Sequence, residues 1–369
     1  MGTTAPDERL RELAEASWQF YIDLAEGAFY LGYTDQSAWV MQKAVAEAET
    51  LGPGDPRLPA SLNRLGVLYY YLGKYRSAEP LFERAVALME QAGASCKAEF
   101  GDMLYNLGGL YKAQGKYPEA ETVFARCLEV WEKTRGPEHP DLALAYQQLG
   151  EMCMHQGRGP EALFALRRAL TLLDARKVQD WVTLVVLTKL AAYYTLQDRY
   201  QEAEPHLWRA LELRRHLQGG DHPKVAKALE QLGQIYTRQR KFARAEPLYR
   251  LSLAILEKSI GRRHPDFLQT LNALAELYVA EGKYSDAEPL FKLSVAAFEQ
   301  ALGAEHPHVA DAWRTTRCCC GPFAGTRRRR CSRRGPEPSG PGGRSRSDAF
   351  RRPLMLICPS SRPISWEVV

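Results

Sequence analysis

Four histidines that each precede a proline could, by residue type, bind a metal ion. They are His139, His222, His264 and His306. A metal site needs all its ligands about 2 Å from one ion. These histidines are separated by one or two units of about 42 residues, which places them roughly 10 Å apart per helical hairpin at ordinary helix packing distances. We interpret them as connector residues near helix starts, and we predict no metal site and no cofactor.

Glycine–lysine pairs suggest phosphate binding, but the rest of that motif is missing. They occur at Gly73-Lys74, Gly115-Lys116 and Gly282-Lys283. A phosphate-binding loop needs G-x-x-x-x-G-K-[ST], and each of these pairs is followed by Tyr and has no Gly at the required distance upstream. We therefore interpret the pairs as turns between helices.

The sequence also lacks the motifs expected for acid–base or nucleophilic catalysis. An Ala-Glu pair recurs, as at Ala78-Glu79, and puts a Glu in the first turn of a helix, where the helix dipole favours it. General acid–base catalysis would need two carboxylates converging in one pocket. Neither a G-x-S-x-G motif nor a suitable Cys–His arrangement occurs. The sequence predicts that the protein is not an enzyme.

Of the eight cysteines, Cys96, Cys127 and Cys153 lie within the repeats and five lie in the tail. Cys127 and Cys153 occupy positions where sister repeats have small or core residues, so we expect buried, reduced thiols. The tail cysteines lack the paired C-x-x-C spacing of a zinc site. These are Cys318, Cys319, Cys320, Cys331 and Cys358.

Composition and charge indicate a folded, cytoplasmic chain with an unusual end. The 369 residues are 45% apolar and 25% charged, which is ordinary for a folded protein. No run of 18 apolar residues and no signal-peptide pattern occurs, so we expect neither membrane insertion nor secretion. Residues 314–369 hold thirteen Arg, no Lys and three acidic residues, a formal charge of +10, which leaves about −5 for residues 1–313.

Internal repeats dominate the region before that tail. A phrase beginning at Leu65 (Leu-Gly-Val-Leu-Tyr) recurs at steps of 42, 42, 41, 42 and 42 residues, and a phrase beginning at Ala78 follows the same rhythm. The later copies of the first phrase begin at Leu107, Leu149, Leu190, Leu232 and Leu274. Apolar residues within each unit recur at three- and four-residue spacing, which predicts two amphipathic helices per unit.

Small and turn-forming residues fit the same hairpin. Glycines such as Gly73 can take the left-handed conformation that ends a helix, whereas Asp198 and Arg240 replace that glycine in two units and should weaken those turns. A small residue, Gly66 in the first full unit, is expected to face Ala78 and let the two helices approach closely. The prolines after the connector histidines suit the first position of a helix.

This pattern resembles the tetratricopeptide repeat position by position. The 42-residue period and phrases such as Gly136-Pro137-Glu138-His139-Pro140 and Leu271-Asn272-Ala273-Leu274-Ala275 resemble the repeats of kinesin light chain and nephrocystin-3. The resemblance implies an all-α fold, a right-handed α-α superhelix (solenoid) of helical hairpins followed by a disordered C-terminal tail.

The repeat positions predict the domain boundaries. We expect a lead-in over residues 1–15, a degenerate first hairpin over 16–54, six hairpins over 55–305, a truncated seventh repeat over 306–314, and the Arg/Pro/Gly-rich tail over 315–369. One helix of the degenerate hairpin is expected to run from Ala16 to Tyr30.

The resemblance also implies a function as a protein-binding scaffold or adaptor. Stacked hairpins form a concave groove lined by the first helices, and kinesin light chain repeats bind peptides there. The residues expected to bind an extended peptide are Asn63, Tyr70, Asn106, Lys112, Gln148, Lys227, Gln231, Arg238 and Asn272. Five more positions are expected to line the groove, namely Asp102, Gln147, Glu151, Gln234 and Glu276. The asparagines match those of the L-N-N-L-A phrase, and the lysines and arginine suit acidic peptide side chains.

Two alternatives stay open on the sequence. The repeats could be the sensor array of a longer signalling or NTPase protein, or the Arg-rich tail could bind nucleic acid or an anionic surface. The tail has no aromatic residues interleaved with its arginines and no recognised nucleic-acid module, so we do not expect nucleic acid, membrane or a small-molecule substrate as a partner. We favour the hypothesis that the tail is a frameshifted or alternatively spliced end, because Cys-Cys-Cys encoded as TGC becomes Leu-Leu-Leu one base over.

Overall fold

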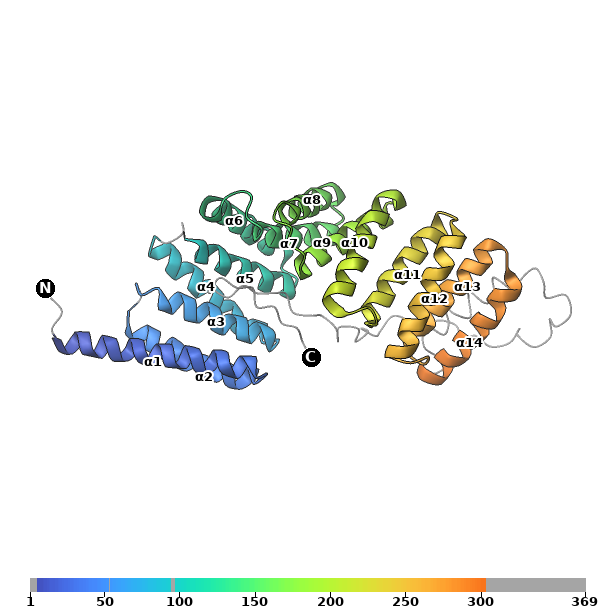
Figure 1. Ribbon diagram of the computed structural model, residues 1–369. Coiled ribbons are helices and arrows are strands. Elements are labelled where there is room, and N and C mark those ends of the chain that lie inside the picture. Colours follow the sequence, from blue (N-terminus) through green and yellow to red (C-terminus); the bar gives the residue numbers. More distant parts are fainter. Residues whose placement is uncertain (1–4, 53, 94–96, 303–369) are drawn as a thin grey trace, which may run out of the picture. The chain divides into compact units, whose positions relative to one another are not determined.

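A computed structural model describes residues 5–52, 54–93 and 97–302, which form helices joined by short connectors (Figure 1). No strand occurs among these residues. The helices are α1 (Ala5–Tyr30), α2 (Thr34–Thr50), α3 (Arg57–Tyr71), α4 (Tyr75–Gln91), α5 (Ala98–Gln114), α6 (Tyr117–Arg135), α7 (Leu142–His155), α8 (Gly159–Ala175), α9 (Trp181–Leu196), α10 (Tyr200–Gln218), α11 (Pro223–Arg238), α12 (Phe242–Ser259), α13 (Pro265–Glu281) and α14 (Tyr284–Leu302). The predicted truncated repeat at 306–314 and the tail at 315–369 lie outside the described residues.

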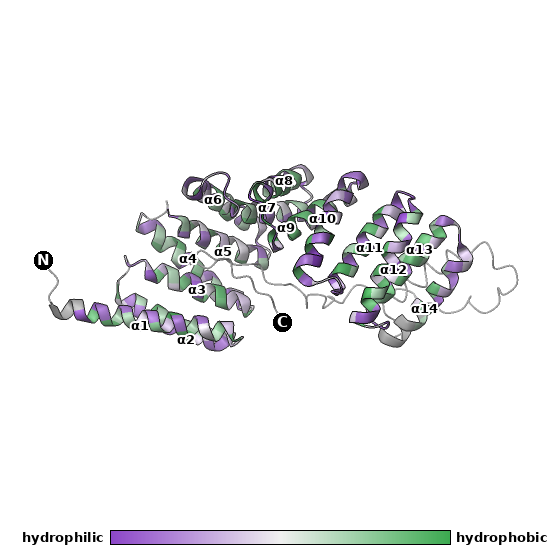
Figure 2. Ribbon diagram, in the orientation of Figure 1, coloured by the Kyte–Doolittle hydropathy of each residue, from purple (hydrophilic) through white to green (hydrophobic). Residues whose placement is uncertain are grey.

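Consecutive helices pack in pairs, so the prediction of an all-α chain of helical hairpins is confirmed. The chain divides after Val178 into two compact units, with α1–α8 in the first and α9–α14 in the second. Within each unit the second helix of one hairpin also packs on the first helix of the next. Hydrophilic and hydrophobic residues alternate along the helices (Figure 2), as expected where one side of a helix is packed and the other is exposed.

The small residue on the first helix of a full hairpin lies very close to the second helix. A Cβ atom on Gly66 would lie 2.8 Å from the Phe82 ring, and one on Gly108 would lie 2.9 Å from the Phe124 ring. The nearest atoms belong to the bulky side chain one turn after Ala78 or its equivalent, and at Gly150 the carbonyl oxygen of Ala162, the equivalent of Ala78, follows at 3.4 Å. The rings of Phe82 and Phe124 are fully buried because glycine leaves room for them.

The turns within the hairpins have the predicted backbone conformation. Gly115 and Gly282 end α5 and α13 with φ angles of 80° and 86°. Asp198 and Arg240 take the same left-handed conformation, with φ angles of 55° and 59°. In this conformation the Cβ atom of a non-glycine residue lies too close to the backbone, so these two turns are strained. They are the same two turns that the sequence predicts to be weaker.

The connector histidines have a structural role. His222 Nδ1 accepts a hydrogen bond from the backbone N–H of Lys224 at 3.1 Å, and His264 Nδ1 accepts one from the N–H of Asp266 at 3.2 Å. Each imidazole thereby satisfies one of the unpaired N–H groups at the start of a helix. The interpretation as connector residues near helix starts is confirmed for these two and for His139, whose Nδ1 accepts a hydrogen bond from the N–H of Asp141 at 3.3 Å. His306 lies outside the described residues.

Helix α1 begins at Ala5, well before the expected start at Ala16. The helix therefore includes most of the segment that we expected to be a lead-in. Arg11 Nε lies 3.3 Å from Glu15 Oε1, and such a pair four residues apart supports a helix in this stretch.

Candidate functional site

In the first unit, four of the predicted peptide-binding residues are buried and not at the surface. Asn63, Tyr70, Asn106 and Gln148 are at most 5% exposed. Asn106 Nδ2 donates to Asn63 Oδ1 at 3.1 Å, which joins α5 to α3, and Gln148 Nε2 donates to the Tyr105 hydroxyl at 3.2 Å, which joins α7 to α5. The expectation that these side chains face the groove is wrong, because neighbouring first helices pack through the two asparagines and Gln148, and Tyr70 packs on Tyr75 of α4, with ring centroids 5.4 Å apart.

Lys112 lies between the helices with charged and polar partners of its own. Its Nζ is 2.6 Å from Glu151 Oε2 and 2.7 Å from Gln148 Oε1. The lysine side chain is only 13% exposed, so an incoming acidic peptide would have to compete with Glu151. This charge therefore stabilises the packing of α5 on α7.

Asp102, a further expected groove residue, belongs to a buried cluster between α5 and α6. Its Oδ1 accepts hydrogen bonds from Trp131 Nε1 at 3.0 Å and from Arg135 Nη2 at 2.6 Å. Burial raises the pKa of Asp102 to about 6, although the arginine and both hydrogen bonds act in the opposite direction. The indole of Trp131 also stacks on Tyr105, with ring centroids 5.6 Å apart.

The predicted buried thiols are confirmed for Cys127 and Cys153, which are free and buried. Cys127 Sγ donates to the Gly101 carbonyl at 3.2 Å. Burial raises the pKa of Cys127 well above its ordinary value, so the thiol stays protonated and unreactive.

In the second unit, a buried glutamate organises the polar side chains of α11 and α13. Glu230 is fully buried and accepts hydrogen bonds from Lys227 Nζ at 3.0 Å, from Gln234 Nε2 at 2.9 Å and from Thr270 Oγ1 at 3.0 Å. The sequence analysis missed Glu230. Its repeat position, equivalent to that of Asn63 and Asn272, was the signal that could have identified it.

The remaining polar residues of α11 and α13 reach the surface. Gln234, Arg238 and Glu276 are exposed, while Gln231 and Asn272 are half-buried. Asn272 Oδ1 is shielded from solvent and accepts no hydrogen bond from the described residues. Desolvation by the surrounding side chains raises the pKa of Glu276, and Arg238 opposes that shift, which places the two charges in one electrostatic environment. We call Gln231, Gln234, Arg238, Asn272 and Glu276 the α11/α13 surface.

The nine predicted residues are divided between the two units. Five lie in the first unit, where four are buried, and four lie in the second, where Lys227, Gln231, Arg238 and Asn272 come from two adjacent helices. Asn63 and Asn272 occupy the same position of the repeat. Each has one side-chain amide atom that is shielded from solvent and has no hydrogen-bond partner among the described residues, Nδ2 in Asn63 and Oδ1 in Asn272. Buried amide atoms without partners are unusual in folded proteins.

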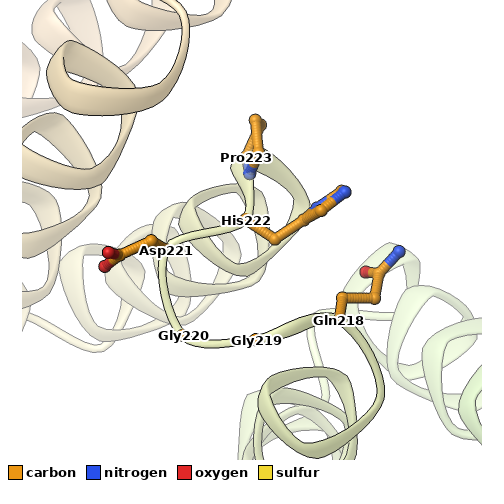
Figure 3. Close-up of a pocket in the computed structure, with 6 residues that line it drawn as sticks. All are labelled: Gln218, Gly219, Gly220, Asp221, His222 and Pro223. Atoms are coloured by element: carbon orange, nitrogen blue, oxygen red, sulfur yellow. The ribbon is translucent and has the colours of Figure 1, made fainter. Parts of the chain in front are cut away.

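One shallow pocket lies in the connector between α10 and α11 (Figure 3). It is lined by Gln218, Gly219, Gly220, Asp221, His222 and Pro223. Both of its titratable side chains serve the fold, since Asp221 pairs with Lys258 and His222 caps α11. The pocket therefore offers no catalytic arrangement.

The described residues contain no group of three or more His, Cys, Asp or Glu side chains that could hold a metal ion. Among their helices, none combines the length and the apolar character that crossing a membrane requires.

Comparison with known proteins identifies the repeat. Tetratricopeptide repeat family descriptions match residues 20–91, 99–175, 182–258 and 267–308, which make up most of the chain. A search of curated proteins found no match.

Solved structures of similar fold include several repeat proteins. BtubC (BKLC) from P. vanneervenii is 23% identical, with 63% of this chain and 92% of that one covered and a TM-score of 0.52. A tetratricopeptide repeat protein from Cytophaga hutchinsonii is 17% identical, with 79% and 98% covered and a TM-score of 0.55. Repeats of a putative kinesin light chain from Podospora anserina are 22% identical, with 54% and 95% covered and a TM-score of 0.48. At these identities the likeness shows the fold alone.

Proposed function

The chain belongs to the tetratricopeptide repeat family, and we propose that it is a non-catalytic scaffold or adaptor that binds an extended peptide segment of a partner protein on the α11/α13 surface. We place this function in the cytoplasm, a compartment that keeps thiols such as those of Cys127 and Cys153 reduced. The observation that carries the proposal is the partial exposure of Gln231 and Asn272 on two adjacent first helices, when the side chains at the same repeat positions in the first unit, Gln148 and Asn63, are buried.

The chemistry of the α11/α13 surface suits a peptide main chain with acidic side chains. Gln231, Gln234 and Asn272 can both donate to and accept from peptide groups. Arg238 supplies a charge that is not consumed by an ion pair within the described residues, whereas Lys227 is paired with Glu230 at 3.0 Å. We therefore expect Arg238 to contribute more to binding than Lys227.

Selection from a random peptide library displayed on phage tests this proposal. The full chain is used as bait, and a selected peptide is then titrated against the wild type and against the Arg238→Ala, Asn272→Ala double variant. We expect enriched acidic peptides and a loss of affinity of at least tenfold, since a charge-assisted hydrogen bond contributes roughly 1.5–3 kcal/mol.

A matched control separates this surface from general charge effects. Arg250 and Lys258 are exposed on α12, the second helix of the same hairpin, so the Arg250→Ala, Lys258→Ala double variant removes a comparable pair of exposed side chains elsewhere. It should bind the selected peptide like the wild type. Equal affinity of all three proteins would refute the placement of the peptide on α11 and α13.

A further inference from the structure

Helix α1 carries a second apolar face that its own hairpin does not use. Large side chains along it are strongly exposed: Leu10 by 66%, Leu13 by 64%, Phe20 by 62% and Leu24 by 47%, and Leu31 directly after the helix by 74%. With the small residues Ser17 and Gly27 they form a line of seven positions, 10, 13, 17, 20, 24, 27 and 31, which we call the outer seam. Soluble proteins rarely leave such a continuous apolar strip uncovered.

The spacing of the outer seam is that of a coiled coil. Its positions alternate between steps of three and four residues over three heptads, the repeat that keeps one helix face against a partner helix. The seam from Leu10 to Leu31 is about 32 Å long at 1.5 Å per residue. A strip of this length and width matches one partner helix.

The opposite face of α1 fixes the helix on its own unit. Ile22 and Ala25 are buried there, Trp18 Nε1 donates to Ser61 Oγ at 2.8 Å, and Arg64 Nη1 lies 2.6 Å from Glu26 Oε1. Helix α1 lies beside α2 at the N-terminal end of the first unit (Figure 1). The outer seam is therefore presented by a rigid helix and is not required for the core of this chain.

We propose that a second copy of this chain covers the outer seam, with the two α1 helices packed antiparallel. In that arrangement Ser17 lies opposite Phe20 of the second copy, Leu13 opposite Leu24, and Leu10 opposite Gly27, so the pairs cover seam positions 10 to 27 and Leu31 lies beyond them. Each small residue then faces a large one, as close packing of a core requires. A parallel pair would instead place Phe20 against Phe20 and leave gaps at Ser17 and Gly27.

The residues beside the seam favour a protein partner and permit a second copy. Five of the flanking positions hold uncharged residues, Ala14, Ala16, Tyr21, Ala28 and Tyr30, and the charged residues beside the seam are Arg9 and Asp23. The antiparallel pair places neither charge opposite a like charge. Helices that lie on membranes carry many Lys and Arg on the polar face, which α1 lacks.

Sedimentation velocity of the full chain, from about 1 to 100 μM, tests the pairing, because an interface of one helix pair lies at the small end of stable interfaces. We expect a monomer–dimer equilibrium for the wild type. The Phe20→Lys variant should weaken dimerisation at least 30-fold. Phe164→Lys is the matched control, because Phe164 on α8 is 67% exposed but lies outside the seam. Far-UV circular dichroism checks that both variants keep the wild-type helix content.

A charge-rescue experiment tests the antiparallel direction. Leu13→Lys and Leu24→Glu should each weaken dimerisation alone. When the two variants are mixed, an antiparallel heterodimer pairs the introduced lysine of one chain with the introduced glutamate of the other and keeps one Leu13–Leu24 contact, so dimers should return to within about tenfold of the wild type. A parallel heterodimer would place each new charge against a leucine, and the mixture would stay dissociated.

Two outcomes would overturn the proposal. A wild-type chain that stays monomeric up to about 100 μM excludes the second copy as the occupant. Vesicles of phosphatidylcholine and phosphatidylserine that bind the monomer through Phe20 would then identify a lipid surface, and contact of residues 303–369 with the seam in cross-linking would identify the chain itself. A dimer that the Phe20→Lys variant leaves intact would show that the interface lies elsewhere.

Discussion

Of the glycines in the described part of the chain, Gly101 leaves the least room for a Cβ atom, and Gly101→Ala is predicted to disrupt its contact with Trp131. A Cβ atom at position 101 would lie 2.4 Å from both Cδ1 and Nε1 of Trp131. The indole cannot move easily, because Trp131 is fully buried, stacks on Tyr105 and donates its N–H to Asp102 at 3.0 Å. Adding one methyl group must therefore displace the largest side chain of this core.

The expected cost follows from two contributions. Overpacking a well-filled core destabilises a protein by about 1–3 kcal/mol. Displacing the indole also lengthens or breaks its hydrogen bond to the buried carboxyl of Asp102, which adds about 1.5–3 kcal/mol for a bond to a charged group. We therefore expect Gly101→Ala to lower the free energy of unfolding of the first unit by about 2.5–6 kcal/mol in total.

Urea unfolding with hydrogen exchange detected by mass spectrometry measures this effect where it occurs. Peptides from α5 and α6 should exchange faster in the variant, while peptides from α11–α14 should not change. Gly220→Ala is the matched control, because a Cβ atom on Gly220 meets no atom within 4 Å. Equal unfolding midpoints for the two variants would refute the steric argument.

A double variant tests whether the clash with the indole is the cause. Two other hairpins hold alanine and leucine at the equivalent positions, Ala143 with Leu173 and Ala226 with Leu256, and all four are buried. The Gly101→Ala, Trp131→Leu double variant recreates that pair. It should be more stable than the sum of the single effects predicts by about 1–2 kcal/mol. Additive effects would show that the methyl group acts through another neighbour.

Three further predictions follow from particular groups. The pKa of Asp102 is raised to about 6, above the 3.8 of an exposed Asp, so its contribution to stability is present below pH 4 and is lost as pH rises through 6. Wild type should therefore lose about 2 kcal/mol relative to Asp102→Asn between pH 4 and 7, and a pH-independent difference in urea midpoint would contradict this. Arg240→Gly should raise the unfolding free energy by about 0.5–1 kcal/mol, because glycine accepts the φ angle of 59° without strain; an unchanged urea midpoint would argue against strain there. A ligand carrying two copies of the selected peptide should bind the wild type about 100-fold more tightly than one copy, and Phe20→Lys should abolish that gain in calorimetry while preserving the single-copy affinity.

The helices and their pairing were predictable from the sequence because the same positions are apolar in every unit. Leu65 and Ala78, with their repeats, specify the packing between the two helices of a hairpin, and that packing is local. The exact partner of the small residue was not predictable, since Gly66 meets Phe82 through a ring whose direction depends on side-chain rotamers. Spacing alone does not specify rotamers.

The repeat spacing is irregular in the sequence near the point where the structure divides into two units. The step between Leu149 and Leu190 is 41 residues, one shorter than the others, and the connector there lacks the Gly-x-x-His-Pro phrase. In the structure that connector contains Lys177 with a φ angle of 54°, and the two compact units meet in sequence at Val178 and Gln179.

The location of the polar side chains was the least predictable feature, because it depends on which residues the next first helix presents. Asn63 is buried since α5 offers Asn106 as its partner, and Tyr105 is buried since α7 offers Gln148. At the same position in the second unit, Asn272 keeps an acceptor atom without a donor from the described residues. Whether a polar residue at one repeat position packs inside the solenoid or stays available for binding thus depends on the residue that the next first helix places beside it. The sequence pattern of a single repeat does not specify that neighbouring residue.

The two proposed surfaces follow from this difference and should be separable by mutation. The first unit uses its polar first-helix side chains for internal packing and exposes an apolar seam on α1, whereas the second unit leaves polar side chains of α11 and α13 exposed. Removing Phe20 changes no residue that α11 or α13 contacts, so it should leave the affinity for a single peptide unchanged. Removing Arg238 should likewise leave the dimer intact. If either variant changed both properties, the division of this chain into one surface for self-association and another for a partner peptide would be incorrect.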